Sequence, residues 1–537
     1  MRIFQRFLFR TMCLFWIGTA SFAVGDDLAE KKTLVDPNSG FNVIAVCGKQ
    51  FQTAFQPWID HRTAQGYRIK VITKGTDLQK LRRSIRTIAA ENPIESVILV
   101  GDSPLVPTHF EKAVVNVKWG SEPEIASDNW FADLDDDAIP DVSIGRLCVD
   151  NSVELEVVVR KIIRYETKPV TDMWPRRVNL VAGVGGFGAI PDAILESATR
   201  SFITKGIPAE YRTSFTYASW RSPYCPDPRE FRDATIDRLN EGSLLWIYIG
   251  HGQRRHLDYI RVPAGIAPIF QEEDISKVRG QSGAPIAVFL SCYAGAFDEE
   301  HDCLAERFVA AENGPVAAIC GSRVTMPYAM AVMGNEMLRE CFANRQTCLG
   351  DVILQAKRRS VAADINDSQR RMLDALAKAI SPEPEKIADE RKEHLWLFNL
   401  IGDPLLRIRH PQSMDVVAPK AAFPGDEISI SFASPVAGKA TVELACPRGR
   451  FTFKPPTRSQ FDASDLGMKS MNGIYRQANQ DVWLRQDLVA NIGDNSTSIK
   501  VADDIQGPIF VRLFVHGDND FAMGSSRVYV RRRPKGK

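Results

Sequence analysis

Two apolar segments of the chain each end in a side chain that can do covalent chemistry. His251 follows the apolar run 244–249, and Cys292 follows the apolar run 285–290. The two residues are 41 positions apart (292 − 251). A thiol is mostly protonated at neutral pH, and a neighbouring imidazole can take its proton as the sulfur attacks a carbonyl carbon. The pair therefore predicts a nucleophile with its base, provided that the fold brings the two segments together.

The elements that must position this pair are strands. Runs rich in Ile, Val and Phe, with no polar residue between, are typical of parallel strands buried on both faces of a sheet. Ligands of open α/β sheets bind beyond the carboxyl ends of such strands. We therefore expect His251 and Cys292 to lie side by side at one edge of a sheet, at the ends of two strands.

The rest of the first 410 residues alternates strand-like and helix-like patterns. Between 40 and 170 we expect strands at 41–47, 67–72 and 96–100, with helices at 51–65, 78–92 and 153–166. Between 171 and 410 we expect strands at 178–184, 244–249, 286–290 and 316–320, with helical stretches between them. This alternation predicts parallel sheets in two α/β subdomains, 40–170 and 171–410, the second being catalytic.

The pattern changes after Pro411. Apolar residues now recur at every second position, around 428–432, 442–446, 509–515 and 528–530, and Pro, Gly and Asp separate the runs. Short alternating strands between such turns predict an antiparallel β-sandwich of immunoglobulin type over 411–537.

The first 25 residues read as an export signal. Arg2, Arg6 and Arg10 precede the apolar stretch 13–23, which is followed by Asp26 and Asp27. A stretch this short is a signal peptide rather than a membrane span, and no second long apolar run follows it. We expect a secreted, periplasmic or cell-surface protein without stable membrane insertion after the signal at 1–25 is removed. Export makes the cysteine count informative, because nine cysteines follow Cys13 and an odd number leaves at least one thiol unpaired.

The overall charge argues against a nucleic-acid partner. The 537 residues include 67 Lys and Arg against 66 Asp and Glu, for a net charge of +1. A surface that tracks a phosphate backbone needs a marked basic excess, which this chain lacks.

The motifs around the pair resemble those of the gingipain-like cysteine peptidases, relatives of caspases and legumains. The resemblance rests on 249–252 (Ile-Gly-His-Gly) and 289–292 (Phe-Leu-Ser-Cys), flanked by 124–128, 140–147 and 398–404 in the family's order. It implies a caspase-like α/β fold, with helices around mainly parallel sheets, followed by an all-β immunoglobulin-like domain. It also implies a cysteine endopeptidase that acts on proteins or peptides without an organic cofactor.

The resemblance assigns a role to each residue of the expected site. Cys292 is the nucleophile and His251 its base. The backbone N–H groups of Gly252 and Cys292 form the oxyanion hole, and glycine suits that position because it lets substrate approach the backbone closely. Two alternatives stay open at this point: a transpeptidase of the same fold, and a catalytically silent exported binding protein.

Asp150 has two interpretations. Counted from the motif 144–146, it falls where the family resemblance would place an acid that orients the histidine. Alternatively, Asp150 or Asn151 caps the helix that follows, as Asp and Asn readily do. We favour the cap.

An acidic run suggests a structural calcium ion. Asp133, Asp135, Asp137 and Asp141 occupy relative positions 1, 3, 5 and 9, a spacing that resembles a calcium loop. The loop departs from the usual pattern, with Ala138 where glycine is preferred and Ile144 where a bidentate glutamate is usual. A solvated acidic turn is the alternative, but the related enzymes are calcium-stabilised and we favour Ca²⁺.

Overall fold

The computed structural model describes residues 40–73, 77–170, 172–184, 205–280, 283–362, 367–518 and 520–532. The predicted signal peptide at 1–25 lies outside these residues. Among the helices of this part of the chain, none is both long and apolar enough to cross a bilayer.

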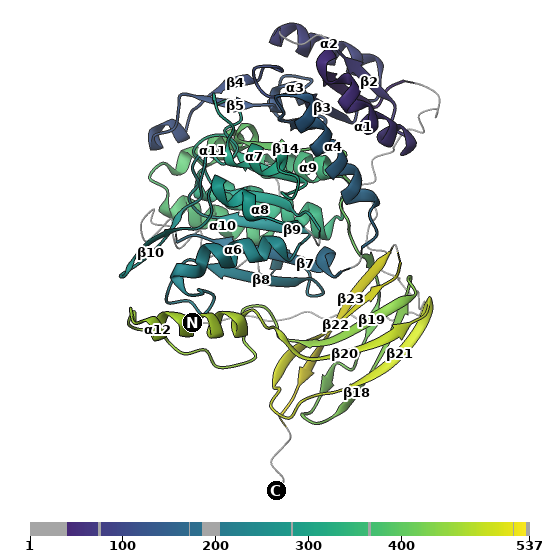
Figure 1. Ribbon diagram of the computed structural model, residues 1–537, viewed down its shortest axis with the longest axis vertical. Coiled ribbons are helices and arrows are strands. Elements are labelled where there is room, and N and C mark those ends of the chain that lie inside the picture. The colour runs from purple at the N-terminus through teal and green to yellow at the C-terminus, as the bar shows by residue number, and fades with distance from the viewer. Residues whose placement is uncertain are drawn as a thin grey trace, which may run out of the picture. The chain divides into compact units, whose positions relative to one another are not determined.

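A ten-stranded sheet organises the chain up to residue 410 (Figure 1). In sheet order the strands are β2 (Ile69–Ile72), β1 (Val43–Cys47), β3 (Ser96–Val100), β6 (Ser143–Leu147), β14 (Phe398–Ile401), β13 (Ala317–Gly321), β12 (Ile286–Leu290), β9 (Leu245–Ile249), β7 (Arg177–Ala182) and β8 (Arg212–Tyr217). Neighbours are parallel except β13 and β14, which pair antiparallel. The mainly parallel α/β fold expected from the sequence is confirmed, and the two expected subdomains share this one sheet.

Strands β9 and β12 are buried along their whole length, as their composition predicts. Successive side chains of a strand point to opposite faces. Leu245, Ile247 and Ile249 of β9 join one hydrophobic cluster, whereas Trp246 and Tyr248 join another. Apolar side chains therefore cover both faces of the sheet here, and only the strand ends are left to meet solvent.

Helices contribute most of the elements that pack on the two faces of the sheet. They are α1 (Gln52–Ala64), α2 (Leu78–Glu91), α3 (Asn129–Ala132), α4 (Ser152–Thr167), α6 (Phe231–Asn240), α7 (Leu304–Ala310), α8 (Pro327–Leu338), α9 (Leu349–Val361), α10 (Ser368–Ile380) and α11 (Ile387–Leu397). Two hairpins accompany them, β4 (His109–Lys112) with β5 (Glu124–Ser127), and β10 (Tyr259–Val262) with β11 (Gly265–Pro268).

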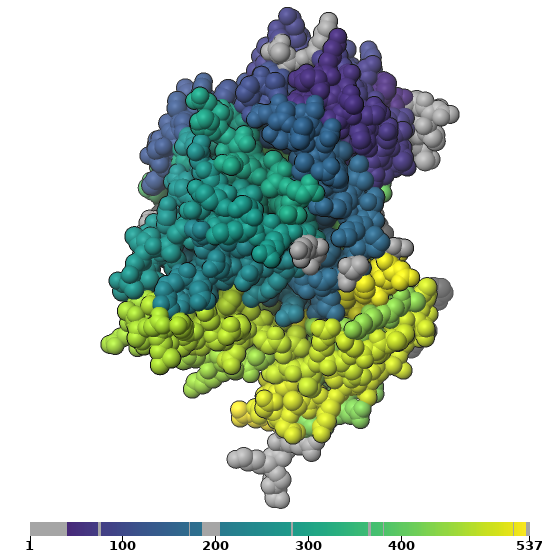
Figure 2. Space-filling view, in the orientation of Figure 1, coloured from purple at the N-terminus to yellow at the C-terminus, as the bar shows by residue number. Residues whose placement is uncertain are grey.

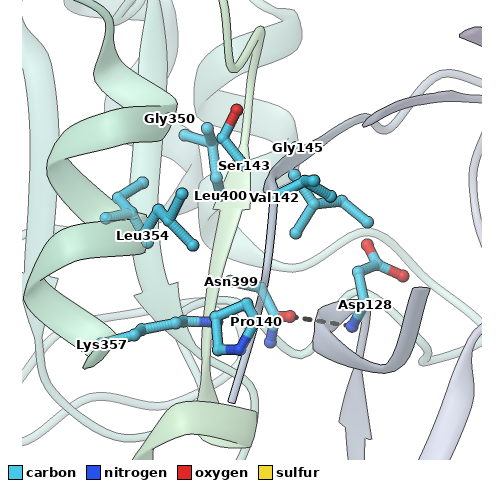
Figure 3. A pocket seen from close by; sticks show the side chains of 12 residues that line it. Asp128, Pro140, Val142, Ser143, Gly145, Gly350, Leu354, Lys357, Asn399 and Leu400 are labelled. Carbon is cyan, nitrogen blue, oxygen red and sulfur yellow. Dashed lines mark hydrogen bonds between the residues drawn. The ribbon is translucent and has the colours of Figure 1, made fainter. Parts of the chain in front are cut away.

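Strand β14 joins the two halves of the sheet. It lies between β6 and β13, and Asn399 on it accepts a hydrogen bond from the backbone of Asp128 at 3.0 Å (Figure 3). Asp128 and Asn399 line a small pocket (Figure 3). Lys357 of α9 also lines it and donates to the side chain of Asn129 at 3.1 Å. Burial lowers the pKa of Lys357 to about 7. The junction is therefore held by polar contacts inside an apolar core.

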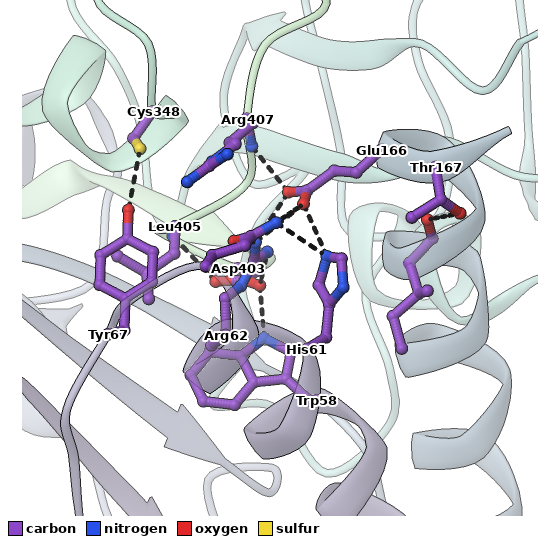
Figure 4. A network of polar contacts seen from close by, with 12 residues as sticks. Trp58, His61, Arg62, Tyr67, Glu166, Thr167, Cys348, Asp403, Leu405 and Arg407 are labelled. Atoms are coloured by element: carbon purple, nitrogen blue, oxygen red, sulfur yellow. Dashed lines mark hydrogen bonds and ion pairs between the residues drawn. The ribbon is translucent and has the colours of Figure 1, made fainter. Parts of the chain in front are cut away.

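A buried ionic network fastens α1 to the turn after β14 (Figure 4). The fully buried guanidinium of Arg62 bonds Asp403 at 2.5 Å and Glu166 at 2.9 Å. The ring of Trp58 also donates to Asp403, and the backbone of Arg407 donates to Glu166 at 2.8 Å. Burial disfavours the charge of Arg62, but the two carboxylates outweigh it and hold its pKa above the ordinary value.

The chain beyond residue 410 forms two β-sheets. One contains β15 (Gln412–Ser413), β17 (Ala421–Ala422), β19 (Gly438–Ala445), β20 (Val482–Ala490), β22 (Gly507–His516) and β23 (Phe521–Val530); the other contains β16 (Val416–Val417), β18 (Glu427–Ser434) and β21 (Gly493–Lys500). Alternate residues of β18 are buried, as the period of two predicts. The expected strands are confirmed, while the immunoglobulin type and the domain boundaries stay predictions.

One element of this region was not expected. Helix α12 (Asp465–Ala478) interrupts the β pattern, and its Tyr475 hydroxyl lies 2.8 Å from Thr216 of β8. The next residue past the helix, Asn479, accepts a hydrogen bond from the backbone of Phe215 at 2.7 Å. In Figure 2 the yellow-green surface of this segment lies directly against the teal α/β region. The helix thus extends the contact between the two parts of the chain.

Candidate active site

The register of β9 and β12 brings the two reactive residues together. The strands are parallel, and their last paired residues are Ile249 and Leu290. His251 and Cys292 each lie two residues beyond that pair. The backbone N–H of Gly250 still bonds Leu290 at 3.2 Å, so the two chains remain adjacent as they leave the sheet. Both His251 and Cys292 are partly exposed, which gives a substrate access to them.

Gly252 makes the closest approach between the two strand ends. A Cβ atom added to it would lie 2.5 Å from the carbonyl oxygen of Cys292 and 2.7 Å from the hydroxyl of Ser291. No other residue type fits there without displacing the backbone that carries the thiol. The requirement for glycine at 252 is therefore steric, and it results from the packing of the two strand ends against each other.

The thiol of Cys292 has a partner that the sequence did not reveal. The backbone N–H of Thr325 donates to Sγ at 3.3 Å, and the Thr325 hydroxyl lies 3.6 Å from Sγ. Burial raises the pKa of Cys292 above its ordinary value, although the contacts with Thr325 oppose that effect. The thiol is thus held in position by Thr325, while burial disfavours its ionised form.

Further polar contacts fix the loops on either side. The hydroxyl of Tyr248 donates to the carbonyl of His251 at 2.7 Å, which fastens the turn after β9. Glu122 accepts from the Tyr293 hydroxyl at 2.8 Å and from Arg254 at 2.5 Å. One carboxylate thereby ties the residue after Cys292 to the loop after His251.

The contacts of Thr325 and Glu122 could not be predicted from the sequence, for a physical reason. Thr325 follows β13, and Glu122 lies in the connection between β4 and β5, so both come from segments far from the two motifs. Their contacts depend on tertiary packing, which no local spacing encodes. One signal was available: Thr325 follows the strand next to β12, where a side chain beyond the strand end is close to Cys292.

The structure does not bring Asp150 to His251. Asp150 is exposed and follows β6, which is four positions from β9 in the sheet. Four inter-strand steps amount to about 19 Å. Asn151 is the N-cap of α4, where its side chain accepts from the backbone of Val153 and Glu154. The local geometry supports the interpretation that this pair of residues caps the helix. The separation across the sheet argues against a role for Asp150 in orienting His251.

The acidic run forms a compact loop in which three of the four predicted ligands converge. Carboxylate oxygens of Asp133, Asp135 and Asp141 all lie within 4.8 Å of one another. Asp137 is exposed and accepts instead from the backbone of Ile139 at 2.7 Å. Three oxygen donors are available for a hard cation, and Asp137 is not grouped with them.

Ala138 shows how the loop turns without glycine. Its φ is 74°, in the left-handed region that glycine prefers, and its N–H donates to Asp133 at 3.1 Å. Arg82 also contacts the loop, through the backbone carbonyl of Asp133 at 2.8 Å and the carboxylate of Asp136 at 2.8 Å. The turn is thus built around the Asp133 carboxylate, whose pKa burial raises.

All nine cysteines of the described residues are free. Seven of them are buried, and Cys148 and Cys292 are less so. Cys148 and Cys292 therefore carry the more accessible thiols, and Cys292 is the one that follows β12.

Solved structures share this fold. The crystal structure of gingipain R, an Arg-specific cysteine proteinase, matches with a TM-score of 0.53 at 16% identity and covers 92% of this chain and 98% of its own. The complex of the Porphyromonas gingivalis RgpB pro- and mature domains matches with a TM-score of 0.52 at 17% identity, covering 91% and 100%. The chain shares their caspase-like α/β fold.

Sequence comparison leads to the family. Lys-gingipain W83 of Porphyromonas gingivalis is 19% identical over 298 residues, which are 53% of this chain and 16% of that protein. The chain thus corresponds to a small part of the curated relatives' length. The profile of peptidase family C25 matches residues 36–409, and the chain belongs to this family. The resemblance inferred from the motifs is confirmed.

Proposed function

We propose that the chain is an exported cysteine endopeptidase in which Cys292 and His251 hydrolyse peptide bonds through an acyl-enzyme. One observation carries the proposal: the close approach of Gly252 to the backbone of Cys292, at the ends of two adjacent parallel strands. Family membership supports the reaction class.

The proposed reaction uses groups from both strand ends. His251 takes the proton of the Cys292 thiol as sulfur attacks the substrate carbonyl carbon, and the C–S bond forms as the carbonyl oxygen becomes an anion. The N–H groups of Gly252 and Cys292 donate to that anion. The protonated His251 then gives its proton to the leaving amine as the C–N bond breaks. Water, deprotonated by His251, attacks the acyl carbon, the C–S bond breaks, and His251 returns the proton to the Cys292 sulfur.

The raised pKa of Cys292 favours one version of this mechanism. Burial disfavours the thiolate and so favours a neutral thiol in the resting site. Proton transfer to His251 then accompanies the attack rather than preceding it. Thr325, whose N–H donates to Sγ, holds the sulfur until substrate arrives.

Labelling with peptide acyloxymethyl ketones tests the nucleophile and the substrate preference together. A panel that varies the residue before the scissile bond should label the wild type and fail to label Cys292→Ala. Cys446→Ala is the control, because this free cysteine follows β19 in the C-terminal region, and it should be labelled like the wild type. Labelling that survives in Cys292→Ala, or no labelling of the wild type by any probe, would overturn the proposal.

The same assay separates the two alternatives. An added amine nucleophile that appears in the product identifies a transpeptidase, whereas products carrying only water-derived carboxyl ends identify a hydrolase. Failure of every probe on folded protein identifies a silent binding protein.

We also propose that Asp133, Asp135 and Asp141 bind a structural Ca²⁺. The convergence of their oxygens supports this, and hard oxygen donors match the cation's preference. Calcium would neutralise the mutual repulsion of the carboxylates and stiffen the loop before β6.

Export rests on the sequence of the first 25 residues. We propose that they direct secretion and are removed. N-terminal sequencing of protein recovered from outside the producing cell checks this, and an N-terminus at Met1 would contradict it.

A further inference from the structure

A second cluster of reactive side chains lies apart from the candidate active site. Asp102 follows β3, Cys148 follows β6, and Glu306 lies in the first turn of α7. The two carboxylates and the thiol each offer one donor atom, and these atoms all lie within 4.8 Å of one another. Neither strand is next to β9 or β12 in the sheet.

The two carboxylates lack the partners that their burial demands. Asp102 is 8% exposed and Glu306 3% exposed. Within the described chain, Oδ1 of Asp102 and Oε1 of Glu306 have no hydrogen-bond partner. The other Glu306 oxygen accepts from the backbone of Cys303 at 2.7 Å. Two buried carboxylates this close together, each with an unpaired oxygen, need a cation or else a shared proton.

The nearest guanidinium is engaged elsewhere. Arg146 forms two hydrogen bonds to Asp128, at 2.6 and 2.8 Å. It also donates to the carbonyls of Gly101 and Val106. Its field reaches Asp102 and Cys148, but these hydrogen bonds do not satisfy the two free oxygens.

We propose that Asp102, Cys148 and Glu306 bind a divalent transition-metal ion of the zinc class. Zinc accepts thiolate and carboxylate ligands, and three protein ligands leave its fourth position for water. The thiolate selects against Ca²⁺ and Mg²⁺, which bind through oxygen. Donors on a tetrahedral zinc are about 3.5 Å apart, so small side-chain rotations suffice to close the site.

The ion has a defined structural consequence. Helix α7 follows the loop that begins at Cys292, and Glu306 is on its first turn. A metal bridge from Glu306 to Asp102 and Cys148 would fasten that loop's far end to β3 and β6. Binding would also release the Cys148 proton, because the thiol must ionise to ligate.

Cobalt absorption tests the site independently of the proposed peptidase activity. The sample is the full chain with Cys292→Ala, which removes the other accessible thiol. Titration with Co²⁺ should produce thiolate-to-cobalt charge-transfer absorption in the near ultraviolet, and Zn²⁺ should abolish it. The oxygen-only loop at Asp133 cannot contribute such a band.

Added substitutions identify the ligands. Cys148→Ser should remove the band. Glu306→Gln should weaken binding by at least about tenfold, since even changes behind a ligand cost about 10- to 100-fold, while its amide oxygen can still accept from Cys303. Cys47→Ser, at a buried cysteine outside the cluster, should leave the titration unchanged.

Two results would overturn the inference. The first is folded Cys292→Ala protein that gives no thiolate band, in which case the carboxyls share a proton instead. The second is a band that persists in Cys148→Ser. If Cys148→Ser does not fold, Zn²⁺ protection of Cys148 from alkylation in the Cys292→Ala protein replaces it, and equal alkylation with and without Zn²⁺ counts against the site.

Discussion

Two regions of the molecule use ionisable side chains in opposite ways. In the network of Arg62, Asp403 and Glu166, every charge faces an opposite charge at hydrogen-bond distance and is buried. At the ends of β9 and β12, Cys292 is partly exposed, and its sulfur is held by contacts with the neutral Thr325. The first arrangement pairs its opposite charges within the fold. The second leaves the sulfur able to form a new bond.

The difference shows how one sheet supports stability and chemistry. A fully paired buried network costs several kcal/mol when one member is lost, because the others keep their charges without partners. A weakly paired thiol costs little to replace but is the group on which covalent chemistry depends. Substitutions in the two regions should therefore separate stability from activity.

Replacing the proposed nucleophile should have the largest effect. We expect Cys292→Ser to lower kcat/KM by about 10⁴-fold or more, because a neutral hydroxyl is a far weaker nucleophile than a thiol, with an unfolding free energy close to that of the wild type. Peptide hydrolysis and chemical denaturation measure the two quantities. Residual activity within tenfold of wild type would place the nucleophile elsewhere.

Breaking the ionic network should lower the stability of the protein but leave the folded molecules reactive. Arg62→Met leaves the buried Asp403 and Glu166 without their shared cation and should destabilise the chain by about 3–5 kcal/mol. Arg164→Met is the control, because its partially exposed pair with Glu312 is worth at most about 1 kcal/mol. Denaturation midpoints check both, and the folded fraction of Arg62→Met should still react with the active-site probe.

Gly252→Ala probes the point where the site depends on packing. The added Cβ would collide with the Cys292 carbonyl and displace the proposed oxyanion donors, so we expect kcat to fall by about 10²- to 10³-fold. Gly473→Ala, in α12 with open space around it, should leave activity unchanged and stabilise the helix slightly. Equal kcat values for the two variants would remove Gly252 from the mechanism.

The pH dependence of thiol alkylation sharpens the contrast further. Because burial raises the pKa of Cys292, the thiolate fraction of the free protein should still be rising with pH between pH 7 and 9. The rate of iodoacetamide modification at Cys292, followed by mass spectrometry, measures it. A plateau below pH 7 would instead indicate a preformed thiolate–imidazolium pair with His251.

Calcium should have the smallest effect. At a concentration 100 times its Kd, Ca²⁺ stabilises a protein that binds it only when folded by about 2.7 kcal/mol. The increase in melting temperature should vanish on chelation and in Asp133→Asn, and should persist in Asp137→Asn, whose carboxylate is outside the cluster. A solvated turn would show no response in any of the three proteins.

The strands that carry His251 and Cys292 could be predicted because their composition is unambiguous. Runs buried on both faces contain no polar residue, so β9 and β12 stand out from the sequence alone. Their adjacency followed from the parallel sheet. Helix α12 could not be predicted within an alternating β pattern, because its packing on β8 is a tertiary contact.

The detailed contacts of the candidate site were harder to predict from the sequence. Asp150 and Asn151 are chemically similar and adjacent, and only the backbone geometry shows that Asn151 takes the cap. The spacing of the acidic run predicted four calcium ligands, of which Asp137 turns outward to bond Ile139. Thr325 reaches Cys292 from another strand end, a contact that depends on sheet order rather than on a motif.

Strand β14 also sets the order of assembly during synthesis. It lies between the strands before residue 150 and those after residue 175. Of the ten strands in this sheet, β14 (Phe398–Ile401) is nevertheless the last to be synthesised. A nascent chain therefore carries His251 and Cys292 well before the sheet can close around β14. Such late, long-range pairing is slow to form. A ribosome-bound fragment ending before residue 398 would hold both His251 and Cys292 in an incomplete sheet.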